Sequence, residues 1–241
     1  MFQFIKVFFK RNKIKIKIKK WVKKGSTIWD LSWLKINNDD VKLLVEMLSN
    51  NQIVTMLYLH NSKIGDEGVE ALAEVLKENN ALSNLELGNN NIGTEGSIAL
   101  AEALLMNKSV TEFNLGGNHV GDEGAKALAE ALKVNKTLTG LFLSINKIGA
   151  EGVKVLAEAL KVNKTLTVLF LSSNEIGYEG AMVLAEALKV NDILTHLNFG
   201  ANEIENEGAI ALAQALKGNH SLKQLFLSEN NIGDEGAKAL A

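Results

Sequence analysis

The chain has 241 residues and a net charge of −2, and it contains neither cysteine nor proline. The absence of cysteine excludes disulfide, thiolate and iron–sulfur chemistry, so packing alone must hold the fold together. The charge is uneven, because residues 1–27 carry ten of the 26 basic residues and none of the 28 acidic ones. Residues 28–241 therefore hold 16 basic and 28 acidic residues, and this net charge of −12 argues against nucleic-acid binding by that part of the chain.

Residues 1–27 form a basic amphipathic N-terminal segment that begins apolar and becomes basic. This order is the reverse of a secretory signal, and the apolar run is too short to span a membrane, so a cytoplasmic location is expected. Ile14, Ile16 and Ile18 alternate with lysines as in an amphipathic strand, which predicts a hairpin with residues 2–9 that caps the next segment. Two other interpretations stay open: attraction of residues 1–27 to an anionic membrane or nucleic acid, and a leader without defined structure.

Residues 28–241 repeat with a period of 28, and each copy places a short leucine strand, an asparagine turn and an alanine-rich helix in that order. The strand triplets begin at Trp29, Leu57, Leu85, Phe113, Leu141, Leu169, Leu197 and Leu225. A short, uniform period predicts one elongated solenoid of about eight repeats. The last copy stops within its helix at Ala241, so we expect either a fragment of a longer array or end-to-end self-association at the uncapped C-terminus.

Polar residues recur at fixed places in each copy. An asparagine ladder should satisfy backbone groups after each strand, with Leu34 and Ser62 as its exceptions. It comprises Asn90, Asn118, Asn146, Asn174, Asn202 and Asn230. A glycine three residues later permits a tight or left-handed turn, and the turn at Glu205, which lacks it, should differ locally.

Each helix should show one apolar face and a defined start and end. In one copy the apolar positions are spaced as on a helix, with Asp122 as the predicted N-cap. These positions are Ala125, Leu128, Ala129 and Leu132. Four asparagines match the glycosylation acceptor pattern, but their position favours left-handed helix C-caps. They are Asn107, Asn135, Asn163 and Asn219.

Strands stack at roughly 4.8 Å whereas helices are bulkier, so the array should curve with its strands on the concave face. The pattern Leu-x-x-Leu-x-Leu-x-x-Asn, followed by Ile-Gly-x-Glu-Gly-Ala-x-Ala-Leu-Ala-Glu-Ala-Leu-Lys-x-Asn, closely resembles the ribonuclease-inhibitor-type leucine-rich repeat over residues 29–241. Among relatives it looks most like the repeat domain of NOD-like receptors. The resemblance implies an α/β fold, a right-handed horseshoe with a parallel concave sheet and convex outer helices, and a context of innate sensing or signalling assembly.

Nothing in the sequence predicts catalysis, a cofactor or a metal. The chain has no phosphate-binding Gly-x-x-x-x-Gly-Lys-Ser/Thr loop, and its one arginine, Arg11, lies outside the repeats, so the repeats supply no arginine finger. A GTPase-regulating role like that of Ran GTPase-activating proteins survives only as an alternative that positions the partner's own groups. The histidines belong to different repeats and are predicted to be isolated on the surface. They are His60, His119, His196 and His220.

The predicted partner surface is the concave face, because alternate strand residues point to opposite sides. Phe142 and Phe170 occupy one position in adjacent strands, so they should form an apolar patch of the kind that marks protein interaction sites. The candidate partner-binding residues are Tyr58, Glu86, Asn114, Phe142, Ile145, Val168, Phe170, His196, Asn198 and Phe226. We expect a protein partner with a basic rim. The alternative interpretation is that the phenylalanines shield the sheet from water and bind nothing.

Overall fold

The computed structural model describes residues 14, 16–21 and 24–241. From residue 28 onward, three-residue strands alternate with helices. The strands are β1 (Ile28–Asp30), β2 (Met56–Tyr58), β3 (Asn84–Glu86), β4 (Glu112–Asn114), β5 (Gly140–Phe142), β6 (Val168–Phe170), β7 (His196–Asn198) and β8 (Gln224–Phe226). The helices are α2 (Asn38–Leu48), α3 (Asp66–Glu78), α4 (Thr94–Met106), α5 (Gly121–Val134), α6 (Ala150–Val162), α7 (Gly177–Leu188), α8 (Glu205–Leu216) and α9 (Asp234–Leu240).

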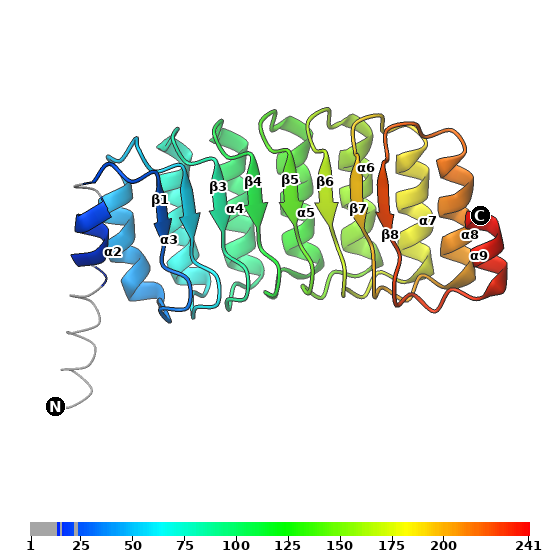
Figure 1. The fold of residues 1–241 in the computed structure, drawn as a ribbon, viewed down its shortest axis with the longest axis horizontal. Helices are drawn as coiled ribbons and strands as arrows, with labels where there is room; N and C mark the ends of the chain where they lie inside the picture. Colours follow the sequence, from blue (N-terminus) through cyan, green and yellow to red (C-terminus); the bar gives the residue numbers. More distant parts are fainter. Residues whose placement is uncertain (1–13, 15, 22–23) are drawn as a thin grey trace.

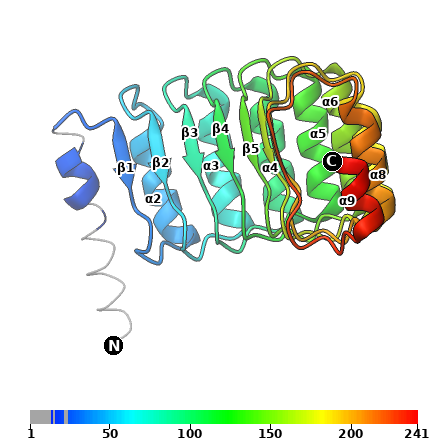
Figure 2. The same cartoon turned by 45° about the vertical axis from the view of Figure 1, so that its right-hand side comes forward.

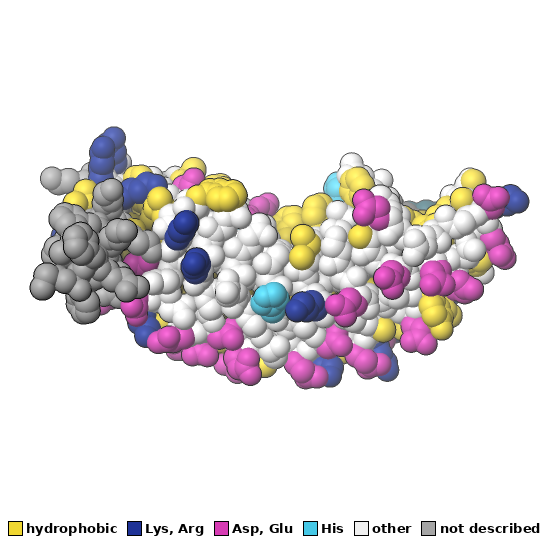
Figure 3. Space-filling view, turned by 90° about the horizontal axis from the view of Figure 1, so that it is seen from below, with side chains coloured by type: hydrophobic (Ala, Val, Ile, Leu, Met, Phe, Trp, Pro, Cys, Tyr) yellow, Lys and Arg dark blue, Asp and Glu magenta, His cyan; other side chains and the backbone are white. Residues whose placement is uncertain are grey.

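The eight strands form one parallel sheet in chain order, β1 to β8 (Figure 1). Each residue pairs with the residue 28 positions later, so that Leu57 lies opposite Leu85 and Leu85 opposite Phe113. Figure 2 shows the helices stacked along one side of this sheet. In Figure 3 the molecule is an arc, with the sheet along its hollow upper side and the helices along its convex lower side. The predicted α/β solenoid is confirmed.

The core lies between the sheet and the helices. The middle residue of a strand, such as Leu57 or Leu169, is fully buried, while its two neighbours remain partly exposed on the concave face. From the helix side, α5 buries the predicted apolar positions, Ala125 and Leu128 among them. Because small alanines line this face, each helix can approach the sheet and the next helix closely.

The predicted asparagine ladder is confirmed, and it joins consecutive repeats. Asn118 Nδ2 donates to Leu87 O in the preceding repeat at 3.0 Å and to Leu115 O in its own at 2.8 Å. Its Oδ1 accepts from Ile92 N at 3.1 Å. Ser62, one of the two exceptions, has a buried hydroxyl without a hydrogen-bond partner among the described residues. The amides thus satisfy backbone groups that no strand ladder reaches.

A second row of asparagines closes the other edge, and here the sequence prediction was wrong. Asn135 at the end of α5 has φ −65° and ψ 134°, an extended conformation and not the predicted left-handed one. Its buried Nδ2 donates to Leu104 O at 2.8 Å, and its Oδ1 accepts from Leu138 N at 2.8 Å. Asn107, Asn163 and Asn219 make the same kinds of bond. A glycan on any of these amides would break bonds that join two repeats.

The starts of four helices, α3, α4, α6 and α9, are fixed by side chains of the preceding repeat. Asp122 Oδ1 accepts from Gly149 N at 2.7 Å and from Gly152 N at 3.1 Å, at the start of α6. Asp66 does the same for α4. Asn38 and Asn206 serve α3 and α9. The prediction that Asp122 caps its own helix was therefore wrong, because α5 has Val120 as its N-cap and the carboxylate serves the next repeat.

The cap decides the conformation of the turn that precedes the helix. Where it is present, the turn glycine is extended, as at Gly149 with φ −95°. Where the capping position holds Thr94, Ala150 or Tyr178, the next turn is left-handed. These turns are at Gly121 (φ 62°), Gly177 (φ 68°) and Glu205 (φ 54°). Their N–H groups then donate to the following repeat, to Asn146 O, Asn202 O and Asn230 O.

Glu205 therefore shares its conformation with Gly121 and Gly177, and differs from the extended turns at the remaining copies. What distinguishes it is that a residue with a side chain adopts the left-handed region, which costs about 1–2 kcal/mol for most residues. Tyr178, at the capping position of the preceding repeat, offers no carboxylate or amide that would hold the turn extended.

In the N-terminal segment, the predicted amphipathic strand was wrong, because residues 14 and 16–21 are helical. Ile14 and Ile18 are buried in the core while Ile16 is 65% exposed, as expected for residues four apart on one helix face. Trp21 stacks on Trp29 with ring centroids 6.4 Å apart. The predicted partner strand, residues 2–9, lies outside the described residues. No helix in the described part of the chain is long and apolar enough to cross a membrane.

Replacing Asp122 with alanine should lower the free energy of unfolding by about 1 kcal/mol, because two N–H groups at the start of α6 lose their acceptor. Urea unfolding followed by circular dichroism measures this. Thr94→Ala is the comparison variant, since Thr94 occupies the same position of another repeat, and its hydroxyl donates to Val120 O at 3.3 Å but accepts no bond from the next helix start. Equal losses in both variants would contradict the role given to Asp122.

Candidate protein-binding surface

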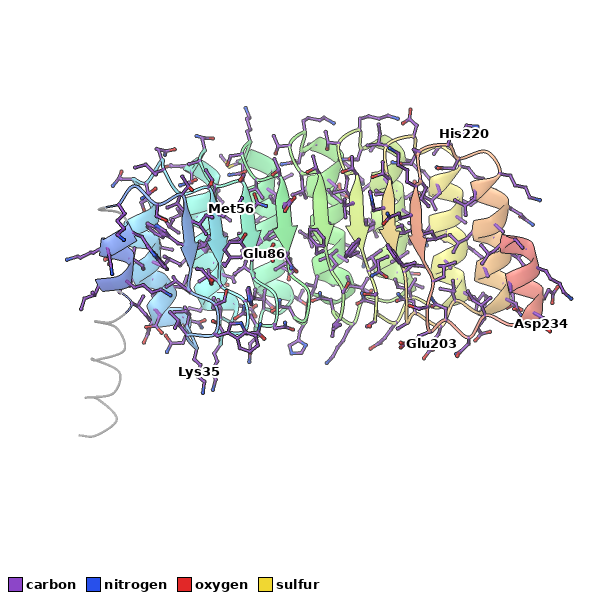
Figure 4. All side chains as sticks on the ribbon, in the orientation of Figure 1. Lys35, Met56, Glu86, Glu203, His220 and Asp234 are labelled. Carbon is purple, nitrogen blue, oxygen red and sulfur yellow. The ribbon has the colours of Figure 1, made fainter. Side chains whose placement is uncertain are left out.

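A groove of about 440 Å³ crosses the concave face from the second repeat to the sixth. Its floor, just after the C-terminal ends of β3 and β4, is largely backbone, because Gly88, Gly116 and Gly117 supply no side chains there. The remaining lining residues are His60, Glu86, Asn89, Asn114, Phe142, Ser144, Ile145 and Phe170. In Figure 4, Glu86 lies in the middle of the sheet face, between the edge marked by His220 and the edge marked by Lys35 and Glu203.

The groove brings together five of the ten predicted partner-binding residues: Glu86, Asn114, Phe142, Ile145 and Phe170. Tyr58 adjoins it through an edge-on contact with His60, with ring centroids 6.4 Å apart. The other four, Val168, His196, Asn198 and Phe226, lie on β6 to β8 and do not line the groove.

The apolar wall of the groove is the predicted phenylalanine pair. Phe142 and Phe170 are register partners on β5 and β6, and their rings meet edge to face with centroids 5.1 Å apart. Gly140, in the same strand as Phe142, makes room for this arrangement, because a Cβ there would lie 3.2 Å from Phe142 Cε2. The ring thus rests over bare backbone and presents a fixed apolar surface.

A carboxylate faces this wall across the floor. Asn114 Nδ2 donates to Glu86 Oε2 at 2.7 Å, and Asn114 Oδ1 accepts from Gly116 N at 2.8 Å. The bond from Gly116 N orients Asn114, and Asn114 in turn orients the Glu86 carboxylate through Oε2. The remaining lone pairs of the carboxylate can accept from a cationic or hydrogen-bond-donating group. The groove therefore combines a fixed negative charge with an aromatic wall.

Ile145 adopts a backbone conformation that β-branched residues avoid. Its φ is 58°, and its side chain is 58% exposed beside the phenylalanine pair. The same position in every other repeat is also left-handed. Those residues are Trp33, Asn61, Asn89, Gly117, Ser173, Ala201 and Glu229. Strain of this kind costs about 1–3 kcal/mol, and its presence in an exposed aliphatic residue points to a use outside folding.

Two aromatic residues of this surface were missed from the sequence. His60 was expected to be isolated, yet its Nδ1 lies 3.0 Å from Ser32 Oγ and its ring meets those of Tyr58 and Trp33 edge-on. Trp33 is 70% exposed and left-handed like Ile145. Comparing repeat positions would have found both, because His60 stands where the other repeats have only glycine or serine, and Trp33 shares its position with Ile145.

Ion pairs that shift pKa values lie away from the groove. A hydrogen bond from Lys42 on α2 to Glu67 on α3 lowers the pKa of Glu67 and raises that of Lys42. A hydrogen bond from Lys164 lowers the pKa of Asp192 at the opposite edge. Such exposed pairs contribute little to stability. No group of three or more potential metal ligands occurs among the residues that the structure describes.

A family model for the leucine-rich repeat matches most of the chain. The matched segments are residues 50–73, 78–101, 107–129, 134–157, 162–185, 190–213 and 218–241. The chain belongs to the leucine-rich repeat family. Each matched segment begins at or just after the end of one helix and covers the following strand and most of the next helix, within the 28-residue leucine-rich repeat seen in the strand register.

Two solved structures resemble this leucine-rich repeat fold. One is leiomodin-1 actin-binding site 2, with a TM-score of 0.50 and 25% identity, covering 60% of this chain and 82% of that one. The other is the tropomodulin C-terminal domain from Caenorhabditis elegans, with a TM-score of 0.52 and 20% identity, covering 62% of this chain and 92% of that one. A comparison with curated proteins finds no match.

Replacing Ile145 with asparagine should raise the free energy of unfolding by about 1 kcal/mol, because asparagine tolerates the left-handed region and occupies this position in two other repeats. Urea unfolding measures the change. Ser173→Asn, one repeat later, should alter stability much less. A loss of stability on replacing Ile145 would show that this side chain supports the fold itself.

Proposed function

We propose that this protein is a non-enzymatic interaction scaffold that binds a protein partner in the groove of its concave face. The observation that carries the proposal is the strained, exposed Ile145 next to the phenylalanine pair. The core does not require these side chains, because the buried layer consists of the middle strand residues and the helix faces. Apolar anchors surrounded by polar groups are the usual composition of an interaction hot spot.

The charge of the site favours a partner with basic groups. Glu86 is oriented by Asn114 within the groove, and Glu112 on β4 accepts from Asn84 Nδ2 at 2.6 Å at the other end of the same strands. Opposite charges across an interface steer association and select partners more than they raise affinity. The phenylalanines then supply affinity and the carboxylates supply orientation.

For the biological context we propose sensing or signalling assembly, as the resemblance to NOD-like receptor repeats implies. The likeness to leiomodin-1 actin-binding site 2 favours a second candidate, an actin partner. Co-sedimentation with filamentous actin and pull-down of monomeric actin separate the two, because a signalling scaffold should remain in the supernatant and bind neither form.

Serine at both Phe142 and Phe170 should weaken partner binding by about tenfold or more, because the variant removes the apolar wall. Affinity capture from a native lysate of the source cells, read by mass spectrometry, compares it with the wild type. Phe226→Ser is the matched control, since Phe226 occupies the same repeat position on β8, is 45% exposed and lies outside the groove.

All variants must first unfold cooperatively at a similar denaturant concentration, so that lost capture reports lost contact. Partners that the Phe226→Ser control retains and the double variant loses would support the groove as the binding site. Equal capture by the wild type and the double variant would refute it and move the site to the helices or the edges.

A further inference from the structure

The groove has a cluster of ring or aliphatic side chains at each end, with glycines and polar side chains between them. At one end, His60 contacts Trp33 and Tyr58 through ring centroids 6.2 and 6.4 Å apart. At the other end, Phe142, Phe170 and Ile145 form the second cluster. Figure 3 shows apolar side chains in separate groups along the hollow side of the arc, with white and acidic surface between them.

The floor between the clusters keeps the path open. The third and fourth repeats carry Gly88, Gly116 and Gly117 where the flanking repeats carry larger side chains. A Cβ at Gly88 would lie 3.2 Å from Gly116 O, so the backbones of the two repeats pack closely here and leave little room for a larger side chain. A ligand crossing this floor meets main chain and three polar side chains, Glu86, Asn89 and Asn114.

The separation of the clusters sets the shape of the ligand. From β2 to β5 there are three strand steps, which amount to about 14 Å at the usual spacing of parallel strands. An extended peptide advances about 3.3 Å per residue and turns alternate side chains to the same face, so side chains four residues apart span about 13 Å. The side chain midway between them faces the same way and reaches the strands that carry Glu86 and Asn114.

Building on the proposed function, we infer that the partner enters the groove as an extended segment lying across the strands, with two apolar side chains four residues apart and a lysine or arginine midway between them. The apolar side chains contact the two clusters, and the basic side chain pairs with Glu86. A folded partner surface would have less need of a continuous groove with two separated clusters. A short linear segment fits these features without rearrangement of the sheet.

A panel of fluorescent synthetic peptides tests the inference. Each peptide carries two leucines two, four or six positions apart in a glycine–serine background, with lysine or glutamate midway between them. Anisotropy titration of the full chain should show the tightest binding for lysine peptides with a separation of four. Separations of two or six, or glutamate in place of lysine, should each weaken binding by about tenfold.

Variants assign each part of the peptide to its contact. His60→Ser, which installs a residue found at this position in other repeats, and Phe142→Ser should each weaken the best peptide by about tenfold, whereas Phe226→Ser should not. Glu86→Gln should remove the preference for lysine over glutamate and leave the preferred separation unchanged. Retention of the lysine preference in that variant would overturn the pairing with Glu86.

Absence of binding by every peptide, or affinity independent of leucine separation, would overturn the extended segment. That failure is distinct from failure of the scaffold proposal. If the Phe142 and Phe170 double variant still loses a captured partner that the Phe226→Ser control retains, the groove binds a folded surface and only the peptide inference falls.

Discussion

The fold depends on buried side-chain amides that each serve two repeats. A three-residue strand satisfies few of the backbone groups around it, and buried backbone groups in the turns on both sides of it need other partners. Asn118 supplies the missing partners at one edge of the sheet and Asn135 at the other, in each case by reaching the backbone of the preceding repeat. Stability is therefore a property of neighbouring pairs, as expected of a quasi-one-dimensional array. Because unpaired buried amides are costly, the same bonds also fix the register.

This regularity makes the departures from it informative. Most concave positions tolerate any residue that suits a shallow, partly exposed sheet, so a feature that opposes the local backbone preference stands out. Ile145 opposes that preference through its left-handed backbone. His60 stands out for another reason, because its side chain is large at a position where the other repeats have glycine or serine. Phe142 is matched by Gly140 beneath its ring. Three irregularities of different physical origin thus meet at one groove.

The sequence predicted the period, the parallel sheet, the outer helices and the first asparagine ladder, because each follows from a residue type repeated at a fixed interval. The prediction that Asp122 caps its own helix was wrong, because the sequence pattern of a cap is the same whether the carboxylate accepts from its own helix or from the next one. Alternation of isoleucine and lysine at 14–18 suggested a strand, but burial of Ile14 and Ile18 against the first repeat selected a helix. Only half of the predicted partner-binding residues line the groove. The prediction came mainly from the central strand position of each repeat, whereas Trp33 and His60 occupy two other positions of the repeat.

The helix caps also define where one structural module ends and the next begins. A capping residue and the turn it controls lie in different 28-residue copies, so a copy cut from the array does not carry its own helix start. Excision of residues 123–150 would remove one period and so keep the strand register. Asp122 would then take the capping position now held by Ala150, in front of the left-handed turn at Gly177. The Asp122 carboxylate would then compete for the N–H group of Gly177, which already donates to Asn202 O. Removing or adding one 28-residue copy therefore keeps the strand register but changes the cap of the helix that follows the junction. In engineering this scaffold, the unit to be moved runs from one capping side chain through the turn that it controls.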